Sequence, residues 1–126
     1  MDCIISIELG TNAVRVYAFD LQGNTVAFAK GSYPTFHPYP NYSEQDPEQI
    51  FITMLYVLKN LLNEKIHSKK YNVVSICFSA SMHSLLVIDK HGAPLGNVIT
   101  WADSRGQNEA RSLQDAAIAE KIYQPV

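Results

Sequence analysis

The chain opens with two short runs in which apolar residues alternate, at least in part, with polar ones. From Cys3 to Leu9 every odd-numbered position is apolar, so these side chains share one face of an extended segment. A partly alternating run follows from Ala13 to Phe19, and a third strand is expected from Thr25 to Ser32 after a turn. The spacing of Asp20 and Gly23 is typical of a type I turn closed by a left-handed glycine. The pattern predicts a three-stranded antiparallel meander.

A proline-rich connector from Gly31 to Asn41 separates the meander from the clearest helical pattern. Asp46 is suited to cap a helix, and Pro47 is suited to its first position. Beyond them, apolar residues recur at the helical period and predict a stripe that packs on a sheet or another helix; they are Ile50, Phe51, Met54, Leu55, Val57, Leu58, Leu61 and Leu62. Polar and basic residues from His67 predict the end of this helix.

The next apolar run, Asn72 to Ser79, is nearly continuous. Such a run is typical of a central parallel strand that is covered on both faces. A further strand is expected from Leu85 to Asp89, followed by a second turn of the Asp-to-Gly kind. The stretch from Leu95 to Thr100 is compatible with a short strand or an extended loop, and Ser104 to Glu120 reads as a second amphipathic helix.

Composition limits the classes of protein that fit. The 126 residues are 47% apolar and 17% charged, enough for the core of one domain. A net charge of −2, with scattered basic residues, gives no electrostatic case for nucleic acid or an anionic membrane. No run approaches the ~18 apolar residues of a membrane span. Cys3 and Cys77 lie in apolar runs without metal-ligand spacing and read as small core residues, so a cytoplasmic protein is expected.

The first turn carries candidate chemistry. Gly10 offers backbone freedom, and Thr11 and Asn12 offer short polar side chains beside free amides. Glu8 precedes this turn and Arg15 follows it, so a carboxylate, amide donors and a guanidinium converge on one spot. This arrangement suits a metal-bound phosphate, but spacing alone favours the simpler interpretation, a hairpin turn with a surface ion pair between Glu8 and Arg15.

A second candidate lies at the end of the predicted parallel strand, in the loop SASMHS from Ser79 to Ser84. In open α/β sheets, ligands bind beyond the carboxyl ends of strands. His83 is therefore a candidate contact, although a packed or capped histidine is the more common role, and Met82 is otherwise a filler of space. Neither a GxxxxGK[ST] nor a GxGxxG loop is present, so a P-loop or dinucleotide-binding enzyme is unsupported.

The segment IELGTNAVRVYAFD resembles the first phosphate loop of the FGGY carbohydrate kinases, except that Glu8 stands where the family has aspartate. FSASMHSLLVID and ITWADSRG resemble the second signature block of that family, and a similar Glu-Gln-Asp-Pro segment precedes its first helix. The variants SASMHS and WADSRG resemble the gluconokinase branch more than the xylulose or glycerol kinases. The resemblance implies an α/β, actin-like ATPase (ribonuclease H-like) domain, whose mixed sheet starts with the meander and has helices packed on it.

The resemblance also implies roles for particular residues. It implies an ATP-dependent kinase that uses Mg²⁺, with Glu8 at the metal and with Gly10, Thr11, Asn12 and Arg15 at the terminal phosphates. The sugar pocket is expected to include Ser81, Met82, His83, Trp101 and Asp103. Arg105 is suited either to a sugar-acid carboxylate or to a structural ion pair. No catalytic residue is expected in this chain, because the family's proton-accepting aspartate lies further downstream.

The family consists of much longer chains with two actin-like domains. Residues 1–126 are therefore expected to be the N-terminal part of the first domain, inactive alone, with the second domain absent. The expected partner of the full-length enzyme is a sugar or sugar acid, with gluconate converted to 6-phosphogluconate, and a homodimer is possible through exposed apolar surface. The alternative is a non-catalytic actin-like regulatory or binding module, because the longer side chain of Glu8 alters the geometry of a metal site.

Overall fold

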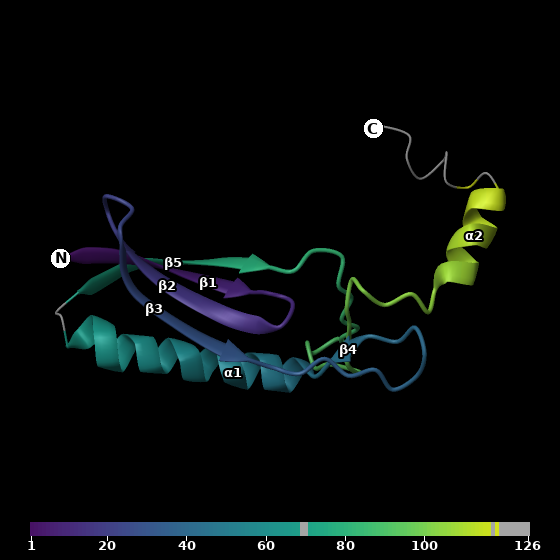
Figure 1. Ribbon diagram of the computed structural model, residues 1–126, viewed down its shortest axis with the longest axis horizontal. Coiled ribbons are helices and arrows are strands. Elements are labelled where there is room, and N and C mark those ends of the chain that lie inside the picture. The colour runs from purple at the N-terminus through teal and green to yellow at the C-terminus, as the bar shows by residue number, and fades with distance from the viewer. Residues whose placement is uncertain (69–70, 117, 119–126) are drawn as a thin grey trace.

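The computed structural model describes residues 1–68, 71–116 and 118. Its main sheet has four strands in the order β3-β2-β1-β5, formed by β1 (Asp2–Leu9), β2 (Ala13–Asp20), β3 (Thr25–Ser32) and β5 (Asn72–Ala80) (Figure 1). β1, β2 and β3 pair antiparallel, whereas β5 runs parallel to β1. The predicted meander is therefore confirmed, including a turn between β2 and β3 in which Gly23 has a φ of 87°.

A long helix covers one face of the meander (Figure 1). It is α1 (Pro47–Leu61), and the carboxylate of Asp46 caps it by accepting hydrogen bonds from the amides of Glu48 and Gln49. Between helix and sheet lies the core, which consists of Cys3, Ile5, Ile7, Val14, Val16, Ala18, Ala27, Tyr33, Val57, Leu61 and Ile66. The predicted start of the helix is confirmed, but after α1 the chain forms a π-helical segment, η1 (Leu62–His67), which places Ile66 in the core.

Gly31 sets how closely α1 approaches the sheet. A Cβ atom at this position of β3 would lie 2.6 Å from a methyl carbon of Val57 and 2.8 Å from that of Thr53. Only a residue without a side chain fits between strand and helix there. The helix consequently packs mainly over β3 and β2.

β5 differs from its predicted environment. It is an edge strand of the sheet, and Val74, Ile76 and Phe78 are exposed. Because α1 lies over the other strands, no described residue buries these side chains, and the prediction of a central strand covered on both faces is wrong for this chain. The same position leaves Cys77 exposed, whereas Cys3 is fully buried as expected.

The remaining chain forms small elements. β4 (Glu44–Gln45) pairs antiparallel with β6 (Val98–Ile99), so the stretch before Thr100 contains a short strand. The strand expected from Leu85 to Asp89 is reduced to isolated bridges, although the turn at Gly92 forms with a φ of 85°.

The second helix begins at Gln107, after its predicted start at Ser104. It is α2 (Gln107–Asp115), which has no buried residue and lies away from the sheet (Figure 1). Residues 117, 119 and 120 of the predicted helix lie outside the described residues. No helix in the described ranges is long and apolar enough to cross a membrane.

Candidate functional site

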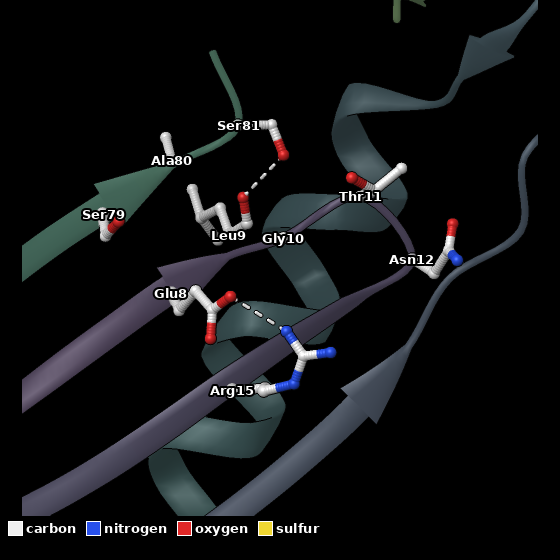
Figure 2. Close-up of a pocket in the computed structure, with 9 residues that line it drawn as sticks. All are labelled: Glu8, Leu9, Gly10, Thr11, Asn12, Arg15, Ser79, Ala80 and Ser81. Carbon is white, nitrogen blue, oxygen red and sulfur yellow. Dashed lines mark hydrogen bonds and ion pairs between the residues drawn. The ribbon is translucent and has the colours of Figure 1, made fainter. Parts of the chain in front are cut away.

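The polar turn after β1 lines a cavity of about 290 Å³. Its walls come from the ends of two neighbouring strands and the start of a third; the lining residues are Glu8, Leu9, Gly10, Thr11, Asn12, Arg15, Ser79, Ala80 and Ser81 (Figure 2). Because β1 and β5 are parallel, their carboxyl ends meet at the same edge of the sheet, where ligands bind in α/β folds. Thus the structure brings the whole predicted phosphate loop together with Ser81.

Glu8 and Arg15 form a cross-strand pair in this cavity. They occupy opposite positions in β1 and β2, and Nη1 of Arg15 donates to Oε1 of Glu8 over 2.9 Å (Figure 2). The side chain of Glu8 is 40% exposed, and that of Arg15 is 36% exposed. A pair this exposed contributes little to folding, and its charges remain accessible to a ligand. The ion pair of the simple hairpin interpretation is therefore present, and it lies inside the cavity.

The conformation of Gly10 differs from expectation. Its φ lies outside the left-handed region, which among the described glycines is reached by Gly23 and Gly92. The constraint is space, because an added Cβ would lie 3.0 Å from Nη1 of Arg15 and 3.2 Å from the carbonyl oxygen of Ala13. The amide of Gly10 also donates to that oxygen, at 3.0 Å, which closes the turn.

Two residues that the sequence pattern does not mark donate hydrogen bonds to backbone oxygens of the turn. The hydroxyl of Tyr33 donates to the carbonyl oxygen of Gly10. The side-chain amide of Gln45 donates to the carbonyl oxygen of Thr11 at 2.5 Å, and to the hydroxyl of Thr35 at 2.8 Å. The only sequence signal for either is that Gln45 belongs to the Glu-Gln-Asp-Pro segment.

The loop after β5 places Ser81 beside the turn. The hydroxyl of Ser81 donates to the carbonyl oxygen of Leu9 at 3.1 Å (Figure 2). The amide of Ser81 donates to the same oxygen at 3.0 Å. Met82 is largely exposed, and His83 adopts a left-handed φ of 61°. Neither Met82 nor His83 lines the cavity. Their assignment to a sugar pocket stays a prediction.

Trp101 connects the two predicted halves of the site. Its indole nitrogen donates to the hydroxyl of Thr11 at 3.2 Å, although the ring is 57% exposed. An exposed aromatic ring beside this polar turn suits packing against the carbon edge of a sugar. The structure thus places Trp101 next to Thr11 of the turn.

Asp103 and Arg105 form a separate polar cluster. Arg105 donates to Asp103 and Glu44, and its guanidinium lies 3.8 Å from the centre of the Tyr42 ring. Asp103 also accepts from the amide of Ser43 at 2.7 Å. Hydrogen bonds from Arg105 hold the pKa of the Asp103 carboxyl well below its usual range, and the Asp103 carboxylate in turn raises the pKa of Arg105. Arg105 therefore forms the structural ion pair left open by the sequence.

Glu8 is the residue of this cavity that suits a metal. Among the described residues no group of three His, Cys, Asp or Glu side chains gathers into a metal cage. Mg²⁺ does not need one, because it retains several waters and binds through one or two carboxylates together with phosphates. A single exposed carboxylate beside the polar turn fits that mode of binding.

Comparison with known proteins gives one consistent result. The model described as the FGGY family of carbohydrate kinases, N-terminal domain, matches residues 3–126. A xylulose kinase of Staphylococcus epidermidis is 32% identical over 125 residues, covering 99% of this chain and 25% of that protein. A gluconokinase of Bacillus subtilis is 29% identical over 120 residues, covering 95% of this chain and 23% of that protein. The chain spans about a quarter of the length of these curated relatives.

Solved structures agree with the sequence comparison. A ligand-bound xylulose kinase from Lactobacillus acidophilus matches 98% of this chain and 24% of its own, with a TM-score of 0.88 and 27% identity. A gluconate kinase from the same species matches 97% of this chain and 24% of its own, with a TM-score of 0.87 and 27% identity. The actin-like α/β fold expected from the sequence is confirmed.

Proposed function

The chain belongs to the FGGY family of carbohydrate kinases, and we propose that the whole protein transfers the terminal phosphoryl group of ATP to a hydroxyl of a small sugar or sugar acid. The observation that carries this proposal is the cavity in which Glu8, the Gly10–Asn12 turn and Arg15 meet at the carboxyl ends of β1 and β5. Residues 1–126 would form the N-terminal part of the first of two actin-like domains.

The residues of the cavity would supply two of the functions that phosphoryl transfer requires. Positioning and charge stabilisation account for most of the catalysis in this class of reaction. Arg15 and the turn Gly10–Asn12 would bind the terminal phosphate oxygens, and Glu8 would hold the hydration shell of Mg²⁺. When bound, Mg²⁺ neutralises charge on the phosphates. The cytoplasm, where ATP is abundant, is the compartment that fits this activity.

The sugar would lie beside the turn. Its contacts would come from the loop after β5 and from the segment that contains Trp101; the proposed residues are Ser81, Met82, His83, Trp101 and Asp103. The Asp103 carboxylate would have to exchange its bonds to Arg105 and Ser43 for bonds to the sugar. Trp101 is the best placed of them, because it already bonds to Thr11. The carboxylate that accepts the proton of the attacking hydroxyl would come from outside residues 1–126.

Gluconate is the substrate we propose first, on the basis of the SASMHS and WADSRG segments. Xylulose is the second candidate, because a xylulose kinase is 32% identical to this chain and a gluconokinase 29%. Arg105 does not favour gluconate, since its guanidinium is engaged by Asp103 and Glu44. The argument for gluconate therefore rests on the two segments alone.

The test is a coupled assay of ADP release by the whole protein with ATP and Mg²⁺, comparing gluconate, xylulose, glycerol and ribulose. We expect the highest kcat/KM with gluconate. A preference for xylulose would replace the proposed substrate but retain the kinase. Absence of turnover with all four would favour a non-catalytic actin-like module.

A further inference from the structure

Three carbonyl oxygens of the turn Gly10–Asn12 are all bound by groups outside it. The Tyr33 hydroxyl binds the oxygen of Gly10, the Gln45 side chain binds that of Thr11, and the backbone amide of Tyr33 binds that of Asn12 at 3.2 Å. A tyrosine and a glutamine from distant segments thus control the orientation of the peptide groups that make up the turn.

The two donors are built into the protein rather than resting on its surface. Tyr33 is 6% exposed and belongs to the core, and Gln45 is 5% exposed. Burial raises the pKa of the Tyr33 phenol, so the hydroxyl keeps its proton and donates it. Neither side chain is free to turn away without leaving a buried polar group unsatisfied.

These bonds determine where the amide groups of the turn point. A trans peptide is planar and directs its C=O and N–H to opposite sides, and no peptide bond of the described residues is cis. Holding the oxygen of Gly10 on one side therefore turns the N–H of Thr11 to the other, and holding the oxygen of Thr11 does the same for the N–H of Asn12. No hydrogen bond within the described ranges uses either N–H.

The two sides of the turn are different cavities. Tyr33 and Gln45 line a mainly apolar cavity of about 300 Å³ together with Pro47, Ile50 and other residues. Thr11 and Asn12 line the polar cavity that contains Glu8 and Arg15. Gly10 borders both. The carbonyl oxygens thus lie toward the side of the buried donors, and the free N–H groups lie toward the side with the guanidinium.

We propose that Tyr33 and Gln45 are positioning residues for phosphate: by binding the carbonyl oxygens of Gly10 and Thr11, they present the N–H groups of Thr11 and Asn12 to a terminal phosphate. Successive N–H groups that face one cavity form an anion site. This inference rests on the proposed function, since it assigns the nucleotide side of the same site. It predicts that losing either donor weakens nucleotide binding and spares the sugar.

The test compares Tyr33→Phe and Gln45→Met in the whole protein with wild type. Phenylalanine keeps the ring that fills the core, and methionine keeps the length of the glutamine side chain. The matched controls are Tyr17→Phe, which removes a hydroxyl from the neighbouring strand, and Gln49→Met, which removes an exposed amide. Dissociation constants for Mg·ADP, KM values for ATP and for the sugar, and the melting temperature are measured for each.

We expect each variant to raise the Kd for Mg·ADP and the KM for ATP by about 5- to 10-fold, the effect of one hydrogen bond, while the KM for sugar stays within about twofold of wild type. Both controls should match wild type. Equal changes in both KM values, or an unchanged affinity for Mg·ADP, would overturn the positioning role. If Gln45→Met fails to fold, Tyr33→Phe alone decides.

Failure of the inference is distinguishable from failure of the proposed function. If wild-type protein binds Mg·ADP and phosphorylates a sugar while Tyr33→Phe does both equally well, only the positioning role is lost. If wild-type protein binds no Mg·ADP, the proposed function falls and the inference falls with it.

Discussion

The carboxylate of Glu8 and the guanidinium of Arg15 face each other from opposite positions in β1 and β2, joined by a hydrogen bond of 2.9 Å. Only Oε1 of Glu8 and one nitrogen of Arg15 take part. On the proposed function, the second carboxylate oxygen would bind a hydrated cation, and the remaining N–H groups of the guanidinium would bind phosphate. One ion pair therefore holds both charged groups at the turn.

Arg15→Gln is expected to weaken nucleotide binding far more than folding. Loss of a charge-assisted contact to phosphate should raise the KM for ATP by about 10-fold or more, whereas loss of an exposed ion pair should change the free energy of unfolding by less than about 1 kcal/mol. Steady-state kinetics and urea unfolding of the whole protein measure the two effects. Lys30→Gln is the control, because Lys30 lies opposite Arg15 on β3 but outside the cavity. Equal effects of the two substitutions would contradict the assignment.

Gly31→Ala is expected to destabilise the fold. The new Cβ would meet Val57 at 2.6 Å and Thr53 at 2.8 Å, so α1 must shift away from β3. Overpacking of this kind costs about 1–3 kcal/mol, measured as a change in the free energy of unfolding. Gly96→Ala serves as a control, since a Cβ there has no neighbour within 4 Å. A Gly31→Ala protein as stable as wild type would show that α1 lies further from the sheet.

Substitutions of His83 are expected to affect folding stability and sugar binding differently. Its φ of 61° is costly for a residue with a side chain and costs glycine nothing. His83→Gly should therefore be at least as stable as wild type and more stable than His83→Ala. If the imidazole contacts the sugar, both variants should raise the KM for sugar by about 10-fold, the scale of one hydrogen bond to a polar group. An unchanged KM for sugar in both would remove His83 from the pocket.

The cluster around Arg105 is expected to make the free energy of unfolding depend on pH in the acidic range. Arg105 lowers the pKa of Asp103, and Asn97 and Arg105 lower that of Glu44. Each folded pKa lies below the unfolded value near 4. Their contribution is therefore fully present above about pH 4, and it is lost as the pH falls through the folded values.

Asp103→Asn tests this dependence. The variant should be less stable than wild type at neutral pH, and the difference in the free energy of unfolding should shrink as the pH falls from about 4 to about 2. Asp115→Asn, an exposed position on α2, should show no such trend. A constant difference across that range would mean that the Asp103 carboxylate is not stabilised by its partners.

Local patterns predict the meander and the start of α1, because alternation, turn residues and the Asp46 cap act within a few residues of each other. They also select Glu8, Gly10 and Arg15, which flank one turn. The exposure of β5 is not predictable in this way. A nearly continuous apolar run indicates that a strand can be buried on both faces. Whether it is buried depends on which elements pack against it, and α1 packs over β2 and β3.

The residues that bind the turn cannot be predicted from the local sequence, for a related reason. Tyr33 and Gln45 bind backbone oxygens 23 and 34 residues away from them. Backbone oxygens are the same in every residue, so no pattern of side chains marks these contacts. Gly10 shows the same limitation, since its spatial constraint comes from Arg15 and Ala13 once the strands have paired.

The most direct test of the account is the rate of phosphoryl transfer by wild type, Glu8→Gln and Glu8→Asp at saturating sugar, as a function of Mg·ATP. Glu8→Gln keeps the size of the side chain and removes the charge that would hold the metal's waters. We predict that its kcat falls by about 100-fold or more, as for loss of one electrostatic group at a reacting phosphate, and that Glu8→Asp retains measurable turnover. A Glu8→Gln protein as active as wild type would contradict the account, because the carboxylate at the phosphate turn would then have no part in the reaction.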